Sequence, residues 1–253
     1  MLLPTLAEGF DLGAHEAMGL RAVTESGLDR YLKDQLGFRE GTSTVISDLI
    51  SSRRVREWIA LGSQLEDSPT VRVRHHFHNP TRTWDQAGLR LAGIQLGQSA
   101  VLWGQERQQV LGGQHSWQDT RASLLRALTA ETDAARSSAY AETFQSLGHL
   151  LHLVQDMASP AHTRNDSHLT VFGIGDPDRF HAWAEEGESL TMIRSSPSRR
   201  FDPSVLTRPV NPLAPVPIAR ILDTERYREM GVPEAGTNIG LAEYSNANFF
   251  RVL

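Results

Sequence analysis

The chain has 253 residues and 40% of them are hydrophobic, so it is long enough to bury a sizeable core in one large domain or two small ones. Its formal net charge is −5 and it has no basic stripe, which disfavours duplex nucleic acid as a partner but leaves single-strand cleavage at a metal open. It contains no cysteine, so disulfides, cysteine-held zinc and thiol nucleophiles are excluded, and a metal would have to be held by histidine and carboxylate.

The first nine residues, MLLPTLAEG, are too short for a complete signal peptide but fit the tail of one. Ala7 and Gly9 are small residues two apart, as a signal peptidase requires. Cleavage after Gly9 would leave Phe10 as the mature terminus. A native N-terminus that frays is an equally good interpretation.

Helical periodicity dominates the next hundred residues. Apolar positions three and four apart predict helices over 14–33 and 44–64, and a longer helix over 83–110 whose pattern is weakened by Gly88, Gly93 and Gly97. The only strand-like alternation is short, at residues 70–77 (TVRVRHHF).

The second half continues in the same way. Residues 116–131, 134–157 and 177–191 predict three more helices. Residues 195–217 are rich in proline and predict an extended surface excursion. Residues 237–253 look helical again. These elements predict an all-α fold, a single multi-helix domain over residues 1–253, and no apolar run is long enough to span a membrane.

The most informative segment is HLLHLVQDMASPAHTRND, within residues 149–166. His152 and Asp156 are four apart, so on a helix they project from one face. Pro160 would break that helix and turn His162 back toward the same region. Imidazole and carboxylate gathered in this way are typical ligands of a cation of the zinc kind.

Other residues fit the same chemistry. His181 and Glu185 repeat the four-residue spacing, which in isolation would more often be a solvated pair. Asp67 precedes His76 in QLEDSPTVRVRHHFHNP. His15 stands alone on the first predicted helix, where the pattern by itself favours an ordinary helix residue.

With these residues in hand, the chain resembles the superfamily of zinc-dependent phospholipases C and single-strand-specific (S1-type) nucleases. The resemblance covers residues 10–185 and is thin beyond them. The matching motifs in chain order are His15, Asp67, His76 with Phe77, H-x-x-x-D at His152 and Asp156, P-x-H at Pro160 and His162, and H-x-x-x-E at His181 and Glu185.

This resemblance implies up to three zinc ions. One would be held by Asp67, His76, His152 and Asp156, and a second by His162, His181 and Glu185. Asp156 would be shared with a third ion, which also takes His15.

The third ion depends on the N-terminus. In the family it also binds the backbone amine and carbonyl of an N-terminal tryptophan, and here Phe10 stands at that offset before His15. Cleavage before Phe10 would restore the site, whereas a terminus at Met1 implies two zinc ions.

The activity that the resemblance implies is that of a zinc-dependent phosphoric diester hydrolase, in which a metal-activated hydroxide attacks the phosphorus. Asp67 would help to orient or deprotonate the water. Phospholipase C is favoured, because the H-x-x-x-E ending and the lack of cysteine are closer to the bacterial phospholipases.

Two alternatives stay open. One is a single-strand-specific nuclease or 3′-nucleotidase on the same trizinc site, although Asn79 stands where the nuclease motif has an aspartate. The other is a zinc-binding helical domain without catalytic activity.

The expected partners are a phospholipid, with peripheral membrane contact, or a single-stranded nucleic acid, and no protein partner is evident. A secreted or periplasmic location follows from the resemblance and the signal-like first residues. His149, His78 and Asn165 are candidates for orienting the ligands or touching substrate, but packing or surface roles are favoured for each.

Overall fold

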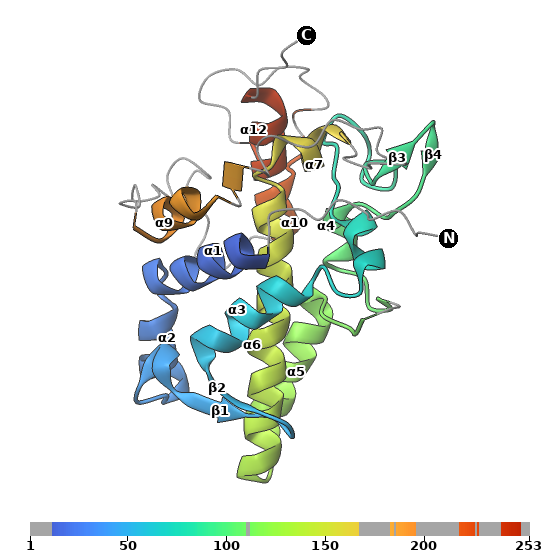
Figure 1. Ribbon diagram of the computed structural model, residues 1–253. Coiled ribbons are helices and arrows are strands. Elements are labelled where there is room, and N and C mark those ends of the chain that lie inside the picture. The colour runs from blue at the N-terminus through green and yellow to red at the C-terminus, as the bar shows by residue number, and fades with distance from the viewer. Residues whose placement is uncertain are drawn as a thin grey trace, which may run out of the picture.

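A computed structural model describes residues 12–109, 112–166, 183–184, 186–195, 218–225, 227 and 239–248. It is a mostly helical single domain built around one long helix, α6 (Asp133–Asp156), which runs through the middle of the molecule (Figure 1). The expected all-α class is confirmed. Among the described helices, none is both long and apolar enough to cross a membrane.

The remaining elements surround α6. The longer helices among the described residues are α1 (Leu12–Glu25), α2 (Leu28–Leu36), α3 (Val55–Leu65), α5 (Trp117–Thr129), α9 (Gly187–Ser195) and α12 (Leu241–Asn248). Shorter helical segments are η1 (Gly41–Ser43), η2 (Thr70–His75), α4 (Ala100–Trp103), α7 (Pro160–Arg164) and α10 (Ile218–Leu222). The strands form two antiparallel hairpins, β1 (Val45–Ser47) with β2 (Ser52–Arg54), and β3 (Arg90–Leu91) with β4 (Ile94–Gln95).

The two central helices begin where the sequence supplies caps. Ser116 precedes α5, where its hydroxyl accepts from the backbone N–H of Asp119 and the Asp119 carboxylate accepts from the Ser116 backbone. Thr132 caps α6 by accepting from the N–H of Ala135. These side chains satisfy backbone donors that the first helical turn leaves without partners. The expected helices 116–131 and 134–157 are confirmed within a residue or two.

Three local predictions are wrong. The first part of the expected helix 44–64 is the β1–β2 hairpin, whose turn is closed by the Asp48 carboxylate accepting from the N–H of Ile50 and Ser51. The expected strand 70–77 is mostly the 3₁₀ helix η2.

The expected helix 83–110 holds the β3–β4 hairpin and the single turn α4. Ala92 and Gly93 both have positive φ angles, 48° and 84°, which is the conformation of a tight two-residue hairpin turn. Glycine tolerates that region without strain, so the glycine that weakened the helical pattern is the residue that makes the turn.

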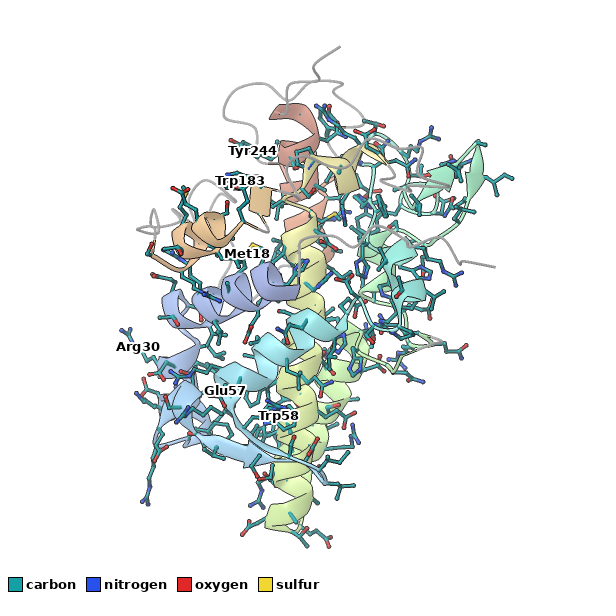
Figure 2. All side chains as sticks on the ribbon, in the orientation of Figure 1. Met18, Arg30, Glu57, Trp58, Trp183 and Tyr244 are labelled. Atoms are coloured by element: carbon teal, nitrogen blue, oxygen red, sulfur yellow. The ribbon has the colours of Figure 1, made fainter. Side chains whose placement is uncertain are left out.

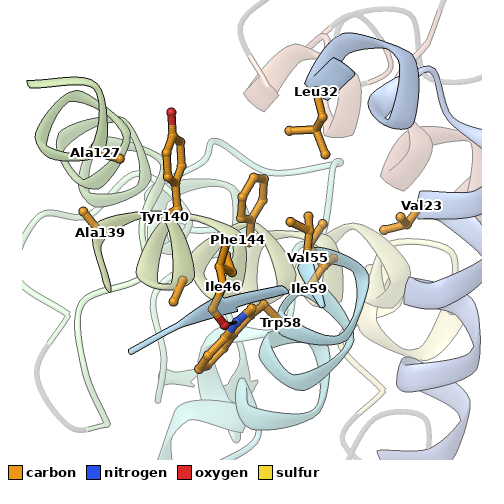
Figure 3. Close-up of a cluster of buried hydrophobic side chains, with 11 residues drawn as sticks. Val23, Leu32, Ile46, Val55, Trp58, Ile59, Ala127, Ala139, Tyr140 and Phe144 are labelled. Carbon is orange, nitrogen blue, oxygen red and sulfur yellow. Dashed lines mark hydrogen bonds between the residues drawn. The ribbon is translucent and has the colours of Figure 1, made fainter. Parts of the chain in front are cut away.

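Two hydrophobic clusters occupy opposite ends of α6. The larger one lies around its first half and includes Trp58 and Ile59 of α3 and Tyr140 and Phe144 of α6 (Figure 3). The second gathers α4, α10 and α12 around Leu153 and Met157 at the other end. Figure 2 shows Trp58 within the body of the molecule, whereas Trp183 and Tyr244 are 44% and 58% exposed.

The crossing of α3 and α6 is unusually close. A Cβ atom at Gly148 would lie 2.7 Å from the Cα of Gly62 and would collide with the carbonyl of Ile59. Only glycine lets the two backbones approach this far. The contact places the end of α3 against the last turns of α6, where the polar residues of the expected site lie.

Candidate metal centre

Six of the expected ligands converge on the last turns of α6. His152 and Asp156 belong to α6 itself. His15 comes from α1, Asp67 from the segment after α3, His76 from the end of η2, and His162 from α7. All six are at most 4% exposed.

The proline turn works as the sequence predicts. Helix α6 ends at Asp156, and α7 begins at Pro160, which needs no N–H at that position. His162 is thereby returned to within 3.5 Å of Asp156, measured from its Nδ1 to Oδ2.

Four residues form one compact set of ligand atoms. His76 Nδ1 lies 3.3 Å from Asp67 Oδ1 and 3.1 Å from Asp156 Oδ2. His152 Nε2 lies 3.5 Å and 3.2 Å from the same two oxygens. These are the four residues that the resemblance assigns to one ion.

The second oxygen of Asp156 faces a different histidine. Its Oδ1 is 3.6 Å from His15 Nε2, while its Oδ2 faces His76 and His152. The His15 ring stacks on that of His152, with centroids 3.7 Å apart. A carboxylate divided between two groups in this way is suited to bridging two cations.

Three of the imidazoles have one nitrogen occupied by a fixed acceptor. His152 Nδ1 donates to the carbonyl of Ser63 at 2.6 Å, and His162 Nδ1 to the carbonyl of His76 at 3.1 Å. His15 Nδ1 donates to Oε1 of Gln155 at 2.6 Å. Because a proton on Nδ1 leaves the lone pair on Nε2, these contacts select Nε2 as the ligand atom of all three histidines.

The surroundings of the two aspartate carboxylates show whether this site fits a bound cation. Both oxygens of Asp67 and of Asp156 are buried and have no hydrogen-bond donor among the described residues. Burying ionised carboxylates without donors is costly unless a positive charge compensates them. Two buried triads, His15 with Asp67 and His152, and His76 with His152 and Asp156, have ligand atoms close enough to share an ion.

The electrostatics favour positive charge at this place. Burial opposes ionisation of His76, but its contacts with Asp156 and Glu66 prevail and raise its pKa to about 10. Burial likewise opposes the charge on Asp156, yet His162 and His152 hold the pKa of this carboxyl well below its usual range. For His15 burial dominates and lowers the pKa well below the ordinary value. The site therefore combines a carboxyl group, Asp156, that favours its ionised form with an imidazole, His76, that favours its protonated form.

The other expected ligands, His181, Glu185 and the backbone of Phe10, lie outside the described residues, as does the proline-rich stretch 196–217.

Two buried residues beside the ligands were not anticipated from the sequence. Gln155 holds His15, and Glu66 is 3.6 Å from the other ring nitrogen of His76, measured from Oε1 to Nε2. A sequence signal existed for one of them, because Gln155 lies three residues after His152 and so continues the polar stripe of α6. For Glu66 the only sequence signal was its position immediately before Asp67.

Of the three candidates for supporting roles, His149 is the one whose side chain contacts Glu66. It is 2% exposed and its Nδ1 donates to Oε2 of Glu66 at 2.6 Å. His78 contacts the region through its backbone N–H, which donates to the carbonyl of His162 at 3.0 Å, and its side chain is tied instead to Asp223, at 2.8 Å. Asn165 pairs with the backbone of Arg90.

Comparison with protein-family models, with curated proteins and with solved structures found no match for this chain. What is established is a mostly helical domain with buried histidine and aspartate clusters able to hold metal.

Proposed function

We propose that the protein is a zinc-dependent phosphodiesterase. The observation that carries the proposal is the group of four donor-free oxygens of Asp67 and Asp156, buried among histidines whose Nδ1 or Nε2 atoms face them. Structural ion pairs rarely leave both carboxylates without a donor, because a hydrogen bond to each is the cheapest compensation for burial.

Zinc is the metal that these ligands favour. Imidazole nitrogen suits zinc, copper, iron and nickel, whereas magnesium and calcium prefer sites made only of oxygen. With no cysteine in the sequence, a mixed nitrogen and oxygen site for phosphate esters is most consistent with zinc.

Each residue then has a defined task. Bound zinc would supply Lewis acidity toward the phosphoryl oxygens and lower the pKa of water. Asp156 holds the two halves of the cluster together through its two oxygens, and His15, His152 and His162 present Nε2 because their Nδ1 atoms are occupied. Asp67, buried next to His76 and His152, orients the attacking water or accepts its proton.

Phospholipase C activity is the preferred form of this proposal. Phe77 is the aromatic residue next to the ligand His76 on which a nucleobase would stack. It is 4% exposed, and its ring stacks on His162 with centroids 4.7 Å apart. A ring buried against a ligand is not available to stack on a base, which removes one feature that a nuclease needs. A nuclease or 3′-nucleotidase on the same metals is the second candidate, and a zinc-binding domain without catalysis the third.

A secreted or periplasmic location belongs to the same proposal. It rests on the family resemblance and on the signal-like residues 1–9.

One comparison of substrates separates these candidates. The zinc-loaded protein is assayed for release of phosphocholine from phosphatidylcholine and for digestion of single-stranded DNA, with and without a chelator. We expect phosphocholine release that the chelator abolishes, and loss of both bound metal and activity in His152→Ala.

Chelator-sensitive digestion of DNA without lipid hydrolysis would transfer the assignment to the nuclease. Activity on neither substrate, with zinc tightly retained, would favour the non-catalytic domain. A His152→Ala protein that kept its metal and activity would overturn the assignment of the site.

A further inference from the structure

A third buried carboxylate, in addition to those of Asp67 and Asp156, lies next to the cluster. Glu66 follows the last residue of α3 and is 1% exposed. It is adjacent in sequence to Asp67. Asp67 faces Nδ1 of His76 on the side of the metal ligands, and Glu66 faces Nε2 on the opposite side of the ring.

The two oxygens of Glu66 are used differently. Oε2 accepts from Arg72 Nη2 and from His149 Nδ1, each at 2.6 Å. Oε1 accepts from the indole N–H of Trp103 at 2.8 Å and is the oxygen that lies 3.6 Å from His76 Nε2.

This carboxylate is held in a fixed orientation from several sides. The guanidinium of Arg72 lies over the Trp103 ring, 5.0 Å from its centroid, and its Nε also donates to the Glu66 carbonyl at 3.2 Å. The His149 ring is stacked on His115 with centroids 3.8 Å apart. Glu66 therefore cannot turn away from His76 without breaking contacts on each of these elements.

His76 faces the aspartates through a different ring nitrogen from His15 and His152. It presents Nδ1 to Asp67 and Asp156, whereas His15 and His152 present Nε2. Its Nε2 is buried and makes no hydrogen bond with any described residue. An imidazole that ligates a metal through Nδ1 carries its proton on Nε2, and that proton needs an acceptor.

We propose that Glu66 is the positioning residue of His76: its Oε1 accepts the Nε2 proton of His76 and thereby keeps Nδ1 free to bind the metal. A small rotation of the imidazole shortens the 3.6 Å separation to a hydrogen bond. This inference rests on the metal site put forward above and assigns to Glu66 a task that its partnership with Arg72 does not require.

The test is the substitution Glu66→Gln, which preserves the size of the side chain but replaces one oxygen by an N–H donor. Arg72 and His149 are two donors, so they retain the remaining oxygen. The amide N–H then takes the place of Oε1, where it loses the hydrogen bond from Trp103 and donates to the Nε2 lone pair of His76. The proton of His76 then moves to Nδ1, the atom that the metal needs.

We expect the zinc affinity of the folded Glu66→Gln protein, measured by competition with a chelating dye, to fall by about tenfold to a hundredfold. The matched control is Glu243→Gln on α12, because Glu243 is also fully buried and is also surrounded by donors, among them the Thr224 backbone and hydroxyl. It should lower thermal stability but leave the zinc affinity within about twofold of wild type.

A second measurement needs no variant. In long-range proton–nitrogen NMR spectra of the zinc-loaded wild type, His76 should carry its proton on Nε2 and have its metal on Nδ1. A proton on Nδ1, or a Glu66→Gln affinity within about twofold of wild type, would overturn the role of Glu66. A folded wild type that binds no zinc would instead overturn the metal site itself, so the two failures are distinguishable.

Discussion

At the scale of single residues, the convergence of His152, Asp156 and His162 could be predicted from the sequence, but the residues that hold their neighbours in place could not. His152, Asp156 and His162 are linked by local rules, the four-residue helical spacing and the proline turn, which hold wherever the helix lies. Gln155 and Glu66 find their partners 140 and 10 positions away, and no local pattern encodes those contacts.

The histidines outside the ligand set give the residue-scale prediction. Burial and, to a smaller extent, the charge of His149 lower the pKa of His115 to about 3. Burial and, to a smaller extent, the charge of Arg74 lower the pKa of His75 to about 4. In the unfolded chain each would titrate near 6.5. Between the folded and the unfolded pKa of each histidine, the unfolded state binds a proton that the folded state does not. The contribution of these histidines to the free energy of unfolding is therefore fully present above pH ~6.5 and is lost as the pH falls toward 3.

Replacing His115 by phenylalanine removes one of these groups and keeps an aromatic ring against His149. The free energy of unfolding in urea, measured with chelator between pH 7 and 4, should fall less steeply in His115→Phe than in wild type. The difference in slope is at most about 1.4 kcal/mol per pH unit, the value for one proton. Parallel pH profiles would show that His115 takes up its proton in the folded state as readily as in the unfolded chain.

At the scale of elements, the sequence predicted well where helices are long and capped, and poorly where they are short. α5 and α6 carry Ser116 and Thr132 as caps and sustain their periodicity over several turns. The β1–β2 hairpin contains Leu49 and Ile50, which are 96% and 93% exposed, so two apolar residues at a turn imitated a buried helical face. Apolar spacing cannot distinguish these cases, because the partner surface is absent from the local sequence.

The element-scale prediction concerns the crossing of α3 and α6. Gly148→Ala places a methyl group against the α3 backbone, including the Cα of Gly62, and should destabilise the protein by about 1–3 kcal/mol in urea unfolding. Because His152 is held by the carbonyl of Ser63 on α3, the same shift should weaken zinc binding.

Gly187→Ala is the control for this change, since a Cβ at Gly187 would meet nothing within 4 Å. Its unfolding free energy should stay within about 0.5 kcal/mol of wild type. If Gly148→Ala were as stable as the control, the close contact between the two helices would not be what positions Ser63.

At the scale of the whole molecule, the polar cluster lies along the part of α6 that joins two hydrophobic clusters. Phe144 belongs to the first and Leu153 to the second, and His149 and His152 lie between them in the sequence. The surrounding helices bury the ligand side chains, so ligand geometry is set by packing. The all-α class could be predicted from periodicity, whereas the way α1, α3 and α7 meet at one level of α6 is a property of the tertiary fold.

The most direct test of the account is the zinc content of the purified protein after dialysis, compared between wild type and Asp156→Asn. Wild type should retain at least about one zinc ion per chain, because two buried triads that share His152 have ligand atoms close enough to hold an ion. Asp156→Asn should lose most of it, while Asp119→Asn at the α5 cap, a carboxylate outside the cluster, should keep it. A folded wild-type protein that retains no zinc, or an Asp156→Asn protein that retains all of it, would contradict the account.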